Sequence, residues 1–405
     1  MLTRRSLLTA LASAPLSAAA RPKIALVITE YRKNAHADVI GTRLLEGYEL
    51  FGQKHAPRVE CVSIYTDQTP PNDMSRAMAA KHKLRVSESV KDALTLGGGR
   101  LAVDGVVLIG EHGAYPYNEK GQHMYPRFQL FKQVVDVFEA GGRAVPVFLD
   151  KHFSFSWEHA KWMYDAARAL RIPLMAGSSV PISWRRPEIE WEYGDPMRHA
   201  VSAAYGPKEA YGFHALEALQ AMAERRKGGE TGVRAVQCLD GWPVWEWTDA
   251  NPWAKRLLLA AVERSEQKMH GEMRVLVRNP SVFAVEYADG LQAAVYLLNG
   301  LIQDFTVAFE IPGKPDPISS EFYLQPGRFF SHFSMLVHYI EELMLRKRAP
   351  YPAERTLLTT GILAAAMDSA YQKGKRIETP HLLFSYRAPK QSFYNRGPVP
   401  ALEAS

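Results

Sequence analysis

The sequence predicts an α/β fold: a Rossmann-like, doubly wound parallel sheet followed by an α+β domain with an open, mostly antiparallel sheet. Two observations predict it. In the first half, short runs that are apolar on both faces alternate with segments of helical periodicity, as buried parallel strands and their crossover helices do. In the second half, strand-like runs follow one another across short turns such as Ala288-Asp289-Gly290, which is typical of antiparallel hairpins.

The first half contains alternating expected strands and helices. The expected strands are Lys23–Thr29, Val59–Tyr65, Gly105–Ile109, Val145–Leu149 and Pro173–Ala176. The expected helices between them are Asp38–Phe51, Met74–Leu84, Ser89–Leu94, Arg127–Ala140 and Trp157–Leu170. In such a sheet the loops after the strands converge on one crevice, where ligands bind.

In the second half of the sequence, strand-like runs follow one another, which predicts a sheet with helices on one face. Its expected strands are Val233–Leu239, Pro243–Trp247, Met273–Val277, Ser281–Tyr287, Leu291–Leu298 and Asp304–Ile311. Its expected helices are Phe213–Arg226, Pro252–Arg264, Phe329–Leu345 and Ala353–Lys373. The expected domains are therefore residues 21–180 and 181–386, followed by a loosely held tail over 387–405. The open sheet is a candidate surface for a homo-oligomer.

The chain of 405 residues begins with a leader-like segment over residues 1–20. Thr3-Arg4-Arg5-Ser6-Leu7-Leu8 opens a short apolar run that closes in Ala18-Ala19-Ala20, which is typical of a twin-arginine-type signal peptide. The run is too short to span a bilayer permanently. We therefore expect a protein that is periplasmic or otherwise exported, with no stable membrane span in the mature chain. The net charge of +6 is spread out, so nothing indicates a nucleic-acid partner.

One polar triplet, Asp150-Lys151-His152, directly follows the apolar strand that ends at Leu149. It lies at the carboxyl end of a parallel strand, where Lys151 can donate a charged hydrogen bond to a substrate hydroxyl.

The order of elements and several motifs resemble the glucose–fructose oxidoreductase/inositol dehydrogenase (Gfo/Idh/MocA) family. Asp150-Lys151-His152 stands where that family has a Glu-Lys-Pro-type motif, and the segment Gly212–Glu217 resembles its Gly-x-His-x-x-Asp signature. The likeness covers most of the mature chain. It implies a carbohydrate or polyol substrate, with Lys151 assisting proton transfer and His214 as the general acid/base. Glu217, one helical turn further on, is expected to orient His214.

The resemblance also implies NAD or NADP as cofactor. The residues expected to face it at the strand ends are Thr29, Glu30, Tyr31, Asp67, Glu111 and Asp150. The sequence departs from the family here, since no glycine precedes Gly41 in the loop after the first strand, where backbone amides would approach a pyrophosphate. Ala210 also stands at the position of the family's catalytic aspartate.

These departures favour two alternatives. In the first, the protein is a nucleotide-free lyase, hydrolase or isomerase on a carbohydrate, and it uses plain acid/base chemistry or a divalent metal bound by imidazoles and carboxylates at the strand ends. The expected ligands are His36, Asp38, His112 and His152. In the second, the protein binds a sugar without catalysis. In every case aromatic and arginine side chains suited to sugars are expected around the substrate, namely Tyr115, Arg127, Trp184 and Arg185.

Overall fold

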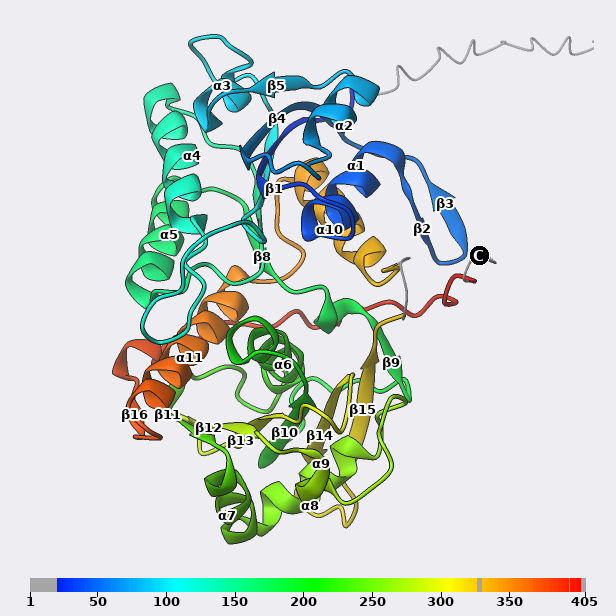
Figure 1. The fold of residues 1–405 in the computed structure, drawn as a ribbon, viewed down its shortest axis with the longest axis vertical. Helices are drawn as coiled ribbons and strands as arrows, with labels where there is room; N and C mark the ends of the chain where they lie inside the picture. The colour runs from blue at the N-terminus through cyan, green and yellow to red at the C-terminus, as the bar shows by residue number, and fades with distance from the viewer. Residues whose placement is uncertain (1–19, 326–329, 393, 402–405) are drawn as a thin grey trace, which may run out of the picture.

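The computed structural model describes residues 20–325, 330–392 and 394–401, and it shows two domains stacked on each other (Figure 1). The first domain is built on a parallel sheet of six strands in the order β5-β4-β1-β6-β7-β8. These strands are β1 (Lys23–Glu30), β4 (Glu60–Gln68), β5 (Arg85–Ser87), β6 (Gly105–Ile109), β7 (Val147–Asp150) and β8 (Leu174–Gly177). The strand order reverses between β1 and β6, so the crevice for ligands lies at their carboxyl ends. The predicted Rossmann-like sheet is confirmed.

Helices cover both faces of this sheet, and the strand residues alternate between them. The helices on one face are α3 (Val90–Thr95), α4 (Arg127–Gly141) and α5 (Trp157–Ala169). Those on the other face are the π-helical turn η1 (Asp38–Thr42), α1 (Arg43–Glu46), α2 (Ser75–His82) and α10 (Phe333–Arg346). The predicted helix over 38–51 ends early, because Gly47 has φ +91° and a hairpin of β2 (Tyr48–Leu50) and β3 (Gln53–His55) follows.

Helix α10 belongs to the first domain, although it was predicted within the second. Leu336, Ile340 and Leu343 are fully buried in one core cluster with Phe148 of β7 and Met175 of β8. The crossover helices α4 and α5 both cover the opposite face. Helix α10 therefore helps to cover the face of the sheet opposite α4 and α5. The first domain thus includes a segment far beyond the boundary expected at residue 180.

The second domain is built on a mixed sheet of eight strands in the order β16-β11-β12-β13-β10-β14-β15-β9. Its strands are β9 (Trp184–Arg186), β10 (His199–Ala204), β11 (Val233–Asp240), β12 (Ser281–Tyr287), β13 (Gln292–Leu297), β14 (Phe305–Glu310), β15 (Ile318–Tyr323) and β16 (Ile377–Glu378). The pairs are antiparallel except β10 with β13. The predicted mostly antiparallel sheet is confirmed.

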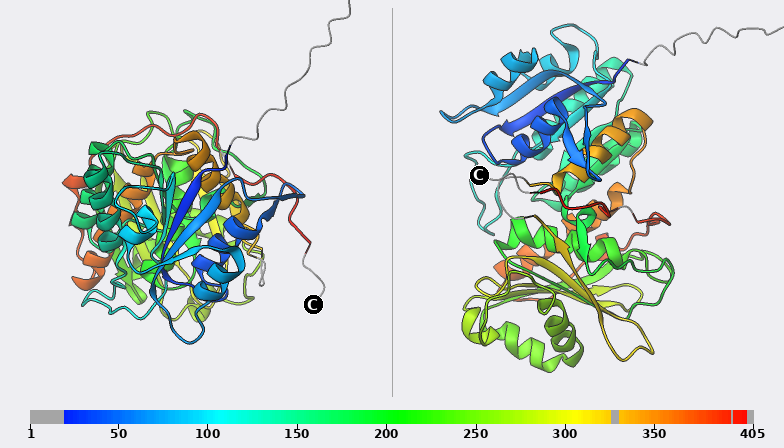
Figure 2. Two further views of the ribbon diagram at one scale, coloured as in Figure 1. Left: turned by 90° about the horizontal axis from the view of Figure 1, so that it is seen from above. Right: turned by 90° about the vertical axis from the view of Figure 1, so that its right-hand side faces the viewer.

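Both faces of the second sheet are covered (Figure 2). On the face toward the first domain lie α6 (Lys208–Ala223) and α11 (Ala353–Tyr371), and on the outer side lie α7 (Trp242–Ala250), α8 (Pro252–Val262) and α9 (Met273–Leu276). The strands predicted over 243–247 and 273–277 are thus helical. Pro243 stands in the first turn of α7, where its missing N–H costs nothing. Helices α7, α8 and α9 cover the outer face of the sheet, and the homo-oligomer expected through this sheet stays a prediction.

The described parts of the tail, residues 387–392 and 394–401, make more contacts with the rest of the chain than predicted. The backbone N–H of Asn395 donates to Ile182 (3.0 Å), and Arg225 donates to the carbonyl of Pro389 (2.7 Å). The side chain of Tyr394 is 4% exposed. Short 3₁₀ turns, η2 (Val180–Ile182) and η3 (Pro380–Leu382), complete the fold.

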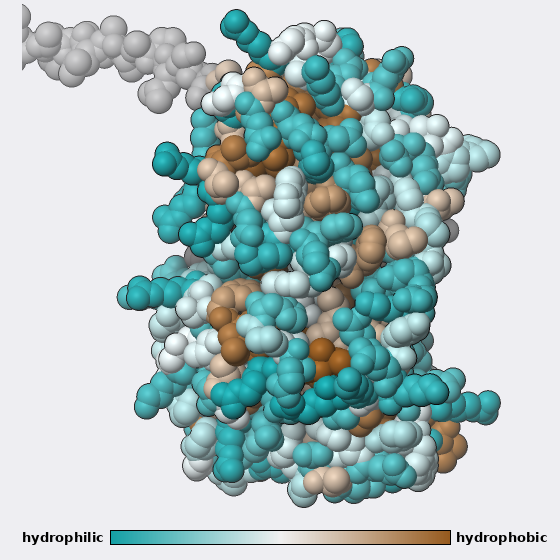
Figure 3. Space-filling view, turned by 90° about the vertical axis from the view of Figure 1, so that its left-hand side faces the viewer, coloured by the Kyte–Doolittle hydropathy of each residue, from teal (hydrophilic) through white to brown (hydrophobic). Residues whose placement is uncertain are grey.

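The side of the molecule formed by α4, α5 and α11 is mainly polar, with hydrophobic residues in small separate patches (Figure 3). Among the described residues, no helix combines the length and apolarity needed to cross a membrane. The predicted leader lies outside the described residues except for Ala20.

Candidate active site

The structure brings Lys151 and His214 into direct contact between the two domains. Lys151 follows β7 of the first domain and His214 lies on α6 of the second, and the lysine Nζ is 2.6 Å from the imidazole Nε2. Both side chains are buried, with 4% and 8% exposed. The strand-end rule and the signature on α6 thus identified two residues that meet.

The backbone at Lys151 is in the left-handed region, with φ +70°. Its N–H donates to the carbonyl of Gly177 (3.2 Å), which anchors the residue to β8. A non-glycine residue in this conformation costs about 1–2 kcal/mol. Strain of this kind persists where the surrounding structure holds it in place, and it gathers at functional sites.

The contact fixes the protonation of His214. An ammonium can only donate, so Nε2 is the acceptor and the imidazole proton lies on Nδ1. Nδ1 is 2.5 Å from the Ser178 hydroxyl oxygen, which accepts that proton and also accepts from the N–H of Val180. Burial, and then the charge of Lys151, hold the pKa of His214 well below its usual value. The imidazole is therefore neutral.

Ser178 is a site residue that the sequence reasoning missed. It follows Gly177 at the carboxyl end of β8, so the rule that selected Lys151 also applied to it. Glu217, expected to orient His214, does not contact the imidazole directly. Its carboxylate accepts from the hydroxyl of Thr359 (2.7 Å) and from the N–H of Ser178 (3.4 Å), so it acts on His214 through the Ser178 backbone. Burial raises the pKa of Glu217.

A buried charge network surrounds Lys151. Glu111, after β6, lies 3.6 Å from the lysine Nζ and accepts from Arg127 at 2.5 Å. Burial opposes its ionisation, but the charges of Lys151 and Arg127 outweigh this and hold the pKa of Glu111 well below its usual value. Arg127 is 1% exposed and reaches past Gly110, where a Cβ atom would lie 2.6 Å from the arginine Cγ. Glycine is therefore required for this packing.

Lys151 and His214 line a hollow of about 460 Å³ between the domains, which we call the first hollow. This volume is within the about 300–1,000 Å³ of small-molecule sites. Its walls combine rings with amides and imidazoles: His36, His112, Tyr125, Tyr205, Tyr211, Gln267, Gln303, Phe305, Gln325 and His332. Such a lining can both stack on a sugar and hydrogen bond its hydroxyls.

The expected metal ligands are not assembled. His36 pairs with Asp150 (2.7 Å), Asp38 accepts from the N–H of Asn34 (2.8 Å) and His152 lies against Arg127. Within the described parts of the chain, no three His, Cys, Asp or Glu side chains are arranged to hold a metal ion. His36, Asp38 and His152 thus each have a partner of their own within the chain. Burial lowers the pKa of His112 to about 4.

Three backbone amides in the loop after β1 are already bonded within the chain and are not available to a pyrophosphate. The N–H of Asn34 donates to the Asp38 carboxylate (2.8 Å), that of Ala35 to the carbonyl of Arg32 (3.0 Å), and that of Asp38 to the carbonyl of Ala35 (3.0 Å). A carboxylate occupies the position where the fold usually binds a phosphate. These residues therefore do not fit the usual mode of dinucleotide binding.

The side chains expected to face the cofactor are largely engaged within the chain. Thr29 and Tyr31 are fully buried, and the Thr29 hydroxyl donates to the carbonyl of Glu111 (2.9 Å). Glu30 accepts from Arg32 at 2.5 Å.

At the end of β4, Asp67 accepts from the hydroxyls of Tyr65 (2.8 Å) and Tyr115 (2.6 Å). In this fold an acidic side chain near this position binds the ribose of the nucleotide. Here the Asp67 carboxylate is hydrogen-bonded to Tyr115, which was predicted to contact the substrate.

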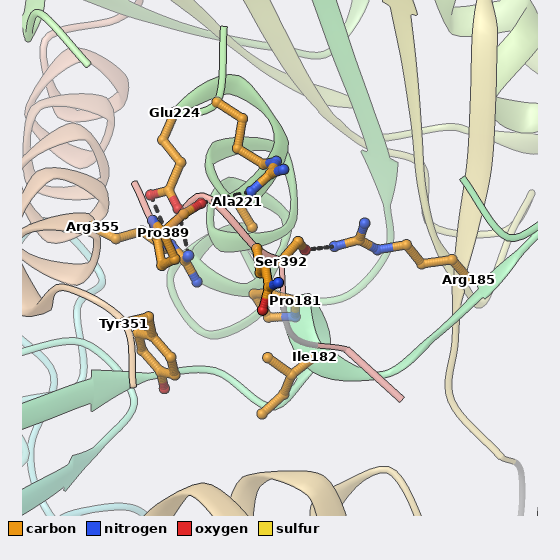
Figure 4. Close-up of a pocket in the computed structure, with 11 residues that line it drawn as sticks. Pro181, Ile182, Arg185, Ala221, Glu224, Tyr351, Arg355, Pro389 and Ser392 are labelled. Atoms are coloured by element: carbon orange, nitrogen blue, oxygen red, sulfur yellow. Dashed lines mark hydrogen bonds and ion pairs between the residues drawn. The ribbon is translucent and has the colours of Figure 1, made fainter. Parts of the chain in front are cut away.

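Trp184 and Arg185, also predicted to contact substrate, lie elsewhere and hold the tail. The Trp184 indole donates to the carbonyl of Gly397 (2.7 Å), and the Arg185 guanidinium donates to Ser392 and stacks on Tyr394. Arg185 lines a cavity of only about 20 Å³, which shares no lining residue with the first hollow (Figure 4). That space is about the size of one water molecule, so the two side chains stabilise the fold.

No protein-family model matches the chain, and no curated protein matches it in sequence. Solved structures do match. GenD2 from gentamicin A biosynthesis, in complex with NAD, is 15% identical, with 93% of this chain and 99% of that chain covered and a TM-score of 0.53. Myo-inositol 2-dehydrogenase from Lactobacillus plantarum is 11% identical, with 88% and 99% covered and a TM-score of 0.55.

A third match is the WlbA dehydrogenase from Bordetella pertussis in complex with NADH and UDP-GlcNAcA. It is 16% identical, with 89% of this chain and 99% of that chain covered and a TM-score of 0.50. The chain therefore shares the two-domain fold of these dehydrogenases over nearly its whole length. This is the fold that the resemblance to the Gfo/Idh/MocA family implied.

Proposed function

We propose that this protein is an enzyme that acts on a sugar or polyol, with Lys151 and His214 moving a proton at a substrate hydroxyl or carbonyl. The observation that carries the proposal is the 2.6 Å contact between the two side chains at the wall of the first hollow. A buried ammonium beside a neutral imidazole supplies a donor and an acceptor at one point.

A substrate hydroxyl that reaches this point accepts a hydrogen bond from the Lys151 ammonium and approaches Nε2 of His214. The lysine polarises the oxygen, and the imidazole receives the hydroxyl proton as the general base. Ser178 accepts from Nδ1 throughout and holds the ring in this tautomer. Glu111 lies 3.6 Å from the lysine Nζ and supplies a counter-charge in the buried site. General acid–base groups of this kind contribute about 10²–10⁴-fold to the rate.

Dehydrogenation with NAD or NADP is the first candidate reaction. It is supported by the shared fold, since two of the matching structures are complexes with NAD or NADH. A second candidate is supported by the loop after β1, in which the amides of Asn34 and Asp38 are already bonded. In this case the same pair performs proton chemistry without a nucleotide, as a lyase or isomerase does.

The test is to purify the mature chain and to record the absorbance and fluorescence of any bound nicotinamide. The protein is then titrated with NAD and NADP, and with a panel of sugars and polyols. The same measurements are made on Lys151→Met, His214→Gln and the control Lys161→Met, which removes an exposed lysine on α5.

Nucleotide binding, with sugar-dependent reduction that falls at least about 100-fold in Lys151→Met, supports dehydrogenation. Turnover without nucleotide that depends on the same residues supports the second candidate. Sugar binding that neither site variant changes, without turnover, would reject the enzyme and leave a binding protein.

We also propose that the protein is exported by the twin-arginine route. The support is the segment Thr3–Leu8 with its paired arginines. Replacing Arg4 and Arg5 together by lysine should retain the protein in the cytoplasm, as measured by cell fractionation. Unchanged export would argue against this route.

A further inference from the structure

A second hollow of about 390 Å³ lies beside the first, and the proposed proton chemistry does not use it. The two hollows share Glu111, Tyr125, Lys151 and Ala210 in their walls. The remaining walls of the second hollow come mainly from the loop that precedes α4, from the start of α6 and from Met367 of α11. The two spaces therefore meet at the lysine that we place in the reaction.

Three buried side chains in the wall of the second hollow have polar atoms that make no hydrogen bond with any described residue. These atoms are Nε of Arg127, Nδ1 of His152 and Oε1 of Glu209, although Oε1 of Glu209 lies 3.8 Å from Nε2 of His152. Their residues are 1%, 3% and 8% exposed. Buried polar atoms without a hydrogen bond are costly and rare, and three in one wall indicate a ligand that supplies both donors and acceptors.

The charges around the second hollow are already balanced. Arg127 pairs with Glu111, Lys208 with Asp240 and Lys120 with Asp368. The Glu209 carboxylate, which also lines the hollow, would repel an anion. The chemistry of the wall thus favours a neutral, hydroxyl-rich ligand over a phosphate or a carboxylate.

Stacked rings form another part of the wall. Tyr117 lies on His123 with ring centroids 4.3 Å apart, and His123 lies 4.0 Å from Tyr125. The outermost ring, Tyr117, is 65% exposed and open to contact. Flat, amphipathic rings of this kind suit the C–H face of a sugar ring.

We propose that the second hollow binds a second sugar unit, and that the substrate is a neutral glycoside of at least two units. The reacting unit lies in the first hollow against His214, and the linkage passes Lys151. This proposal rests on the proposed function and adds no chemical step to it. It extends the substrate class from a free sugar or polyol to a glycoside.

The test compares matched pairs of probes on the mature protein by isothermal titration calorimetry: glucose with cellobiose and maltose, galactose with lactose, and mannose with mannobiose. At least one disaccharide should bind about tenfold or more tightly than its monosaccharide, a difference equal to about 1.4 kcal/mol. Glu209→Gln and Tyr117→Ala should each reduce the disaccharide affinity toward that of the monosaccharide. Neither should change the affinity for the monosaccharide.

Two variants serve as controls: Glu246→Gln on α7 and Tyr193→Ala, both of exposed residues. Neither should change the binding of any probe. Disaccharides that bind no better than monosaccharides, with both site variants unchanged, would overturn the proposal. If Lys151→Met still abolished monosaccharide binding in that case, the proposed function would survive. Failure of every probe to bind would reject both together.

Discussion

Replacing Arg127 by methionine should be strongly destabilising, because it leaves a buried carboxylate with too little compensation. Arg127 is 1% exposed and donates to Glu111 at 2.5 Å and to His152 at 3.2 Å. In Arg127→Met, Lys151 at 3.6 Å is the one lysine or arginine that the described residues leave paired with Glu111. Removing one partner of a buried ion pair costs about 3–5 kcal/mol. This is a large part of the about 5–15 kcal/mol that holds a domain folded.

The assay is urea denaturation of the mature protein at pH 7, followed by circular dichroism and tryptophan fluorescence. The matched control is Lys132→Met on the same helix, whose exposed pair with Asp136 is worth about 0.3–0.5 kcal/mol. Combining Arg127→Met with Glu111→Gln should recover part of the loss, since an amide needs no counter-charge. A loss below about 1 kcal/mol for Arg127→Met, or no recovery in the double variant, would refute the reasoning.

Three further predictions follow from the same site and its surroundings. Gly177→Ala should lower the free energy of unfolding by roughly 2 kcal/mol or more, because φ is +125° and the new methyl would lie 2.6 Å from a carboxylate oxygen on α6. Gly121→Ala, with φ +75° and open space, isolates the backbone part of that loss in the same denaturation assay. Burial and the charge of Asp304 raise the pKa of Glu321 to about 8. The folded protein therefore binds a proton that the unfolded chain releases, and stability should fall as the pH rises from about 4.5 to 8. Glu321→Gln should reduce this dependence in denaturation at pH 5 and pH 9, and an equal slope in both proteins would contradict it. Because burial and the adjacent ammonium lower the pKa of His214, its imidazole signals in selectively labelled protein should not shift between pH 5.5 and 8. A titration near pH 6.5 would show that the ring is not held neutral.

Much of the fold and the centre of the site could be predicted, because both depend on short-range patterns. Apolar runs of strand length located β1, β6 and β7. The same pattern placed Lys151 at the carboxyl end of a parallel strand, where ligands bind in this kind of sheet. His214 was located by the motif on α6, and the structure brings the two together across the domain boundary.

The rest depends on contacts between distant parts of the chain, which no local pattern encodes. No local pattern in the sequence of α10 indicates that its apolar face packs against the sheet of the first domain. Trp184 and Arg185 look like sugar-binding residues, but they contact Gly397 and Ser392, more than 200 positions away. The predicted metal site is absent for the same reason, since His36 contacts Asp150 at the end of β7 and His152 contacts Arg127 at the start of α4.

Lys151 and His214, which we call the proton pair, come from other parts of the chain than the loop after β1, where a nucleotide would bind. The fold alone therefore does not identify the reaction. The geometry of Lys151 and His214 is set by β7, β8 and α6, whereas the amides that would hold a pyrophosphate belong to the turn between β1 and η1. A sequence can therefore keep the first while changing the second, and a shared fold does not by itself identify the hydride acceptor. Grafting a glycine-rich turn onto residues 30–37 would test this independence. It should create nucleotide binding while leaving the affinity for sugars unchanged. A simultaneous loss of sugar binding would show that the loop and the proton pair are coupled through Glu111, whose carbonyl accepts from Thr29.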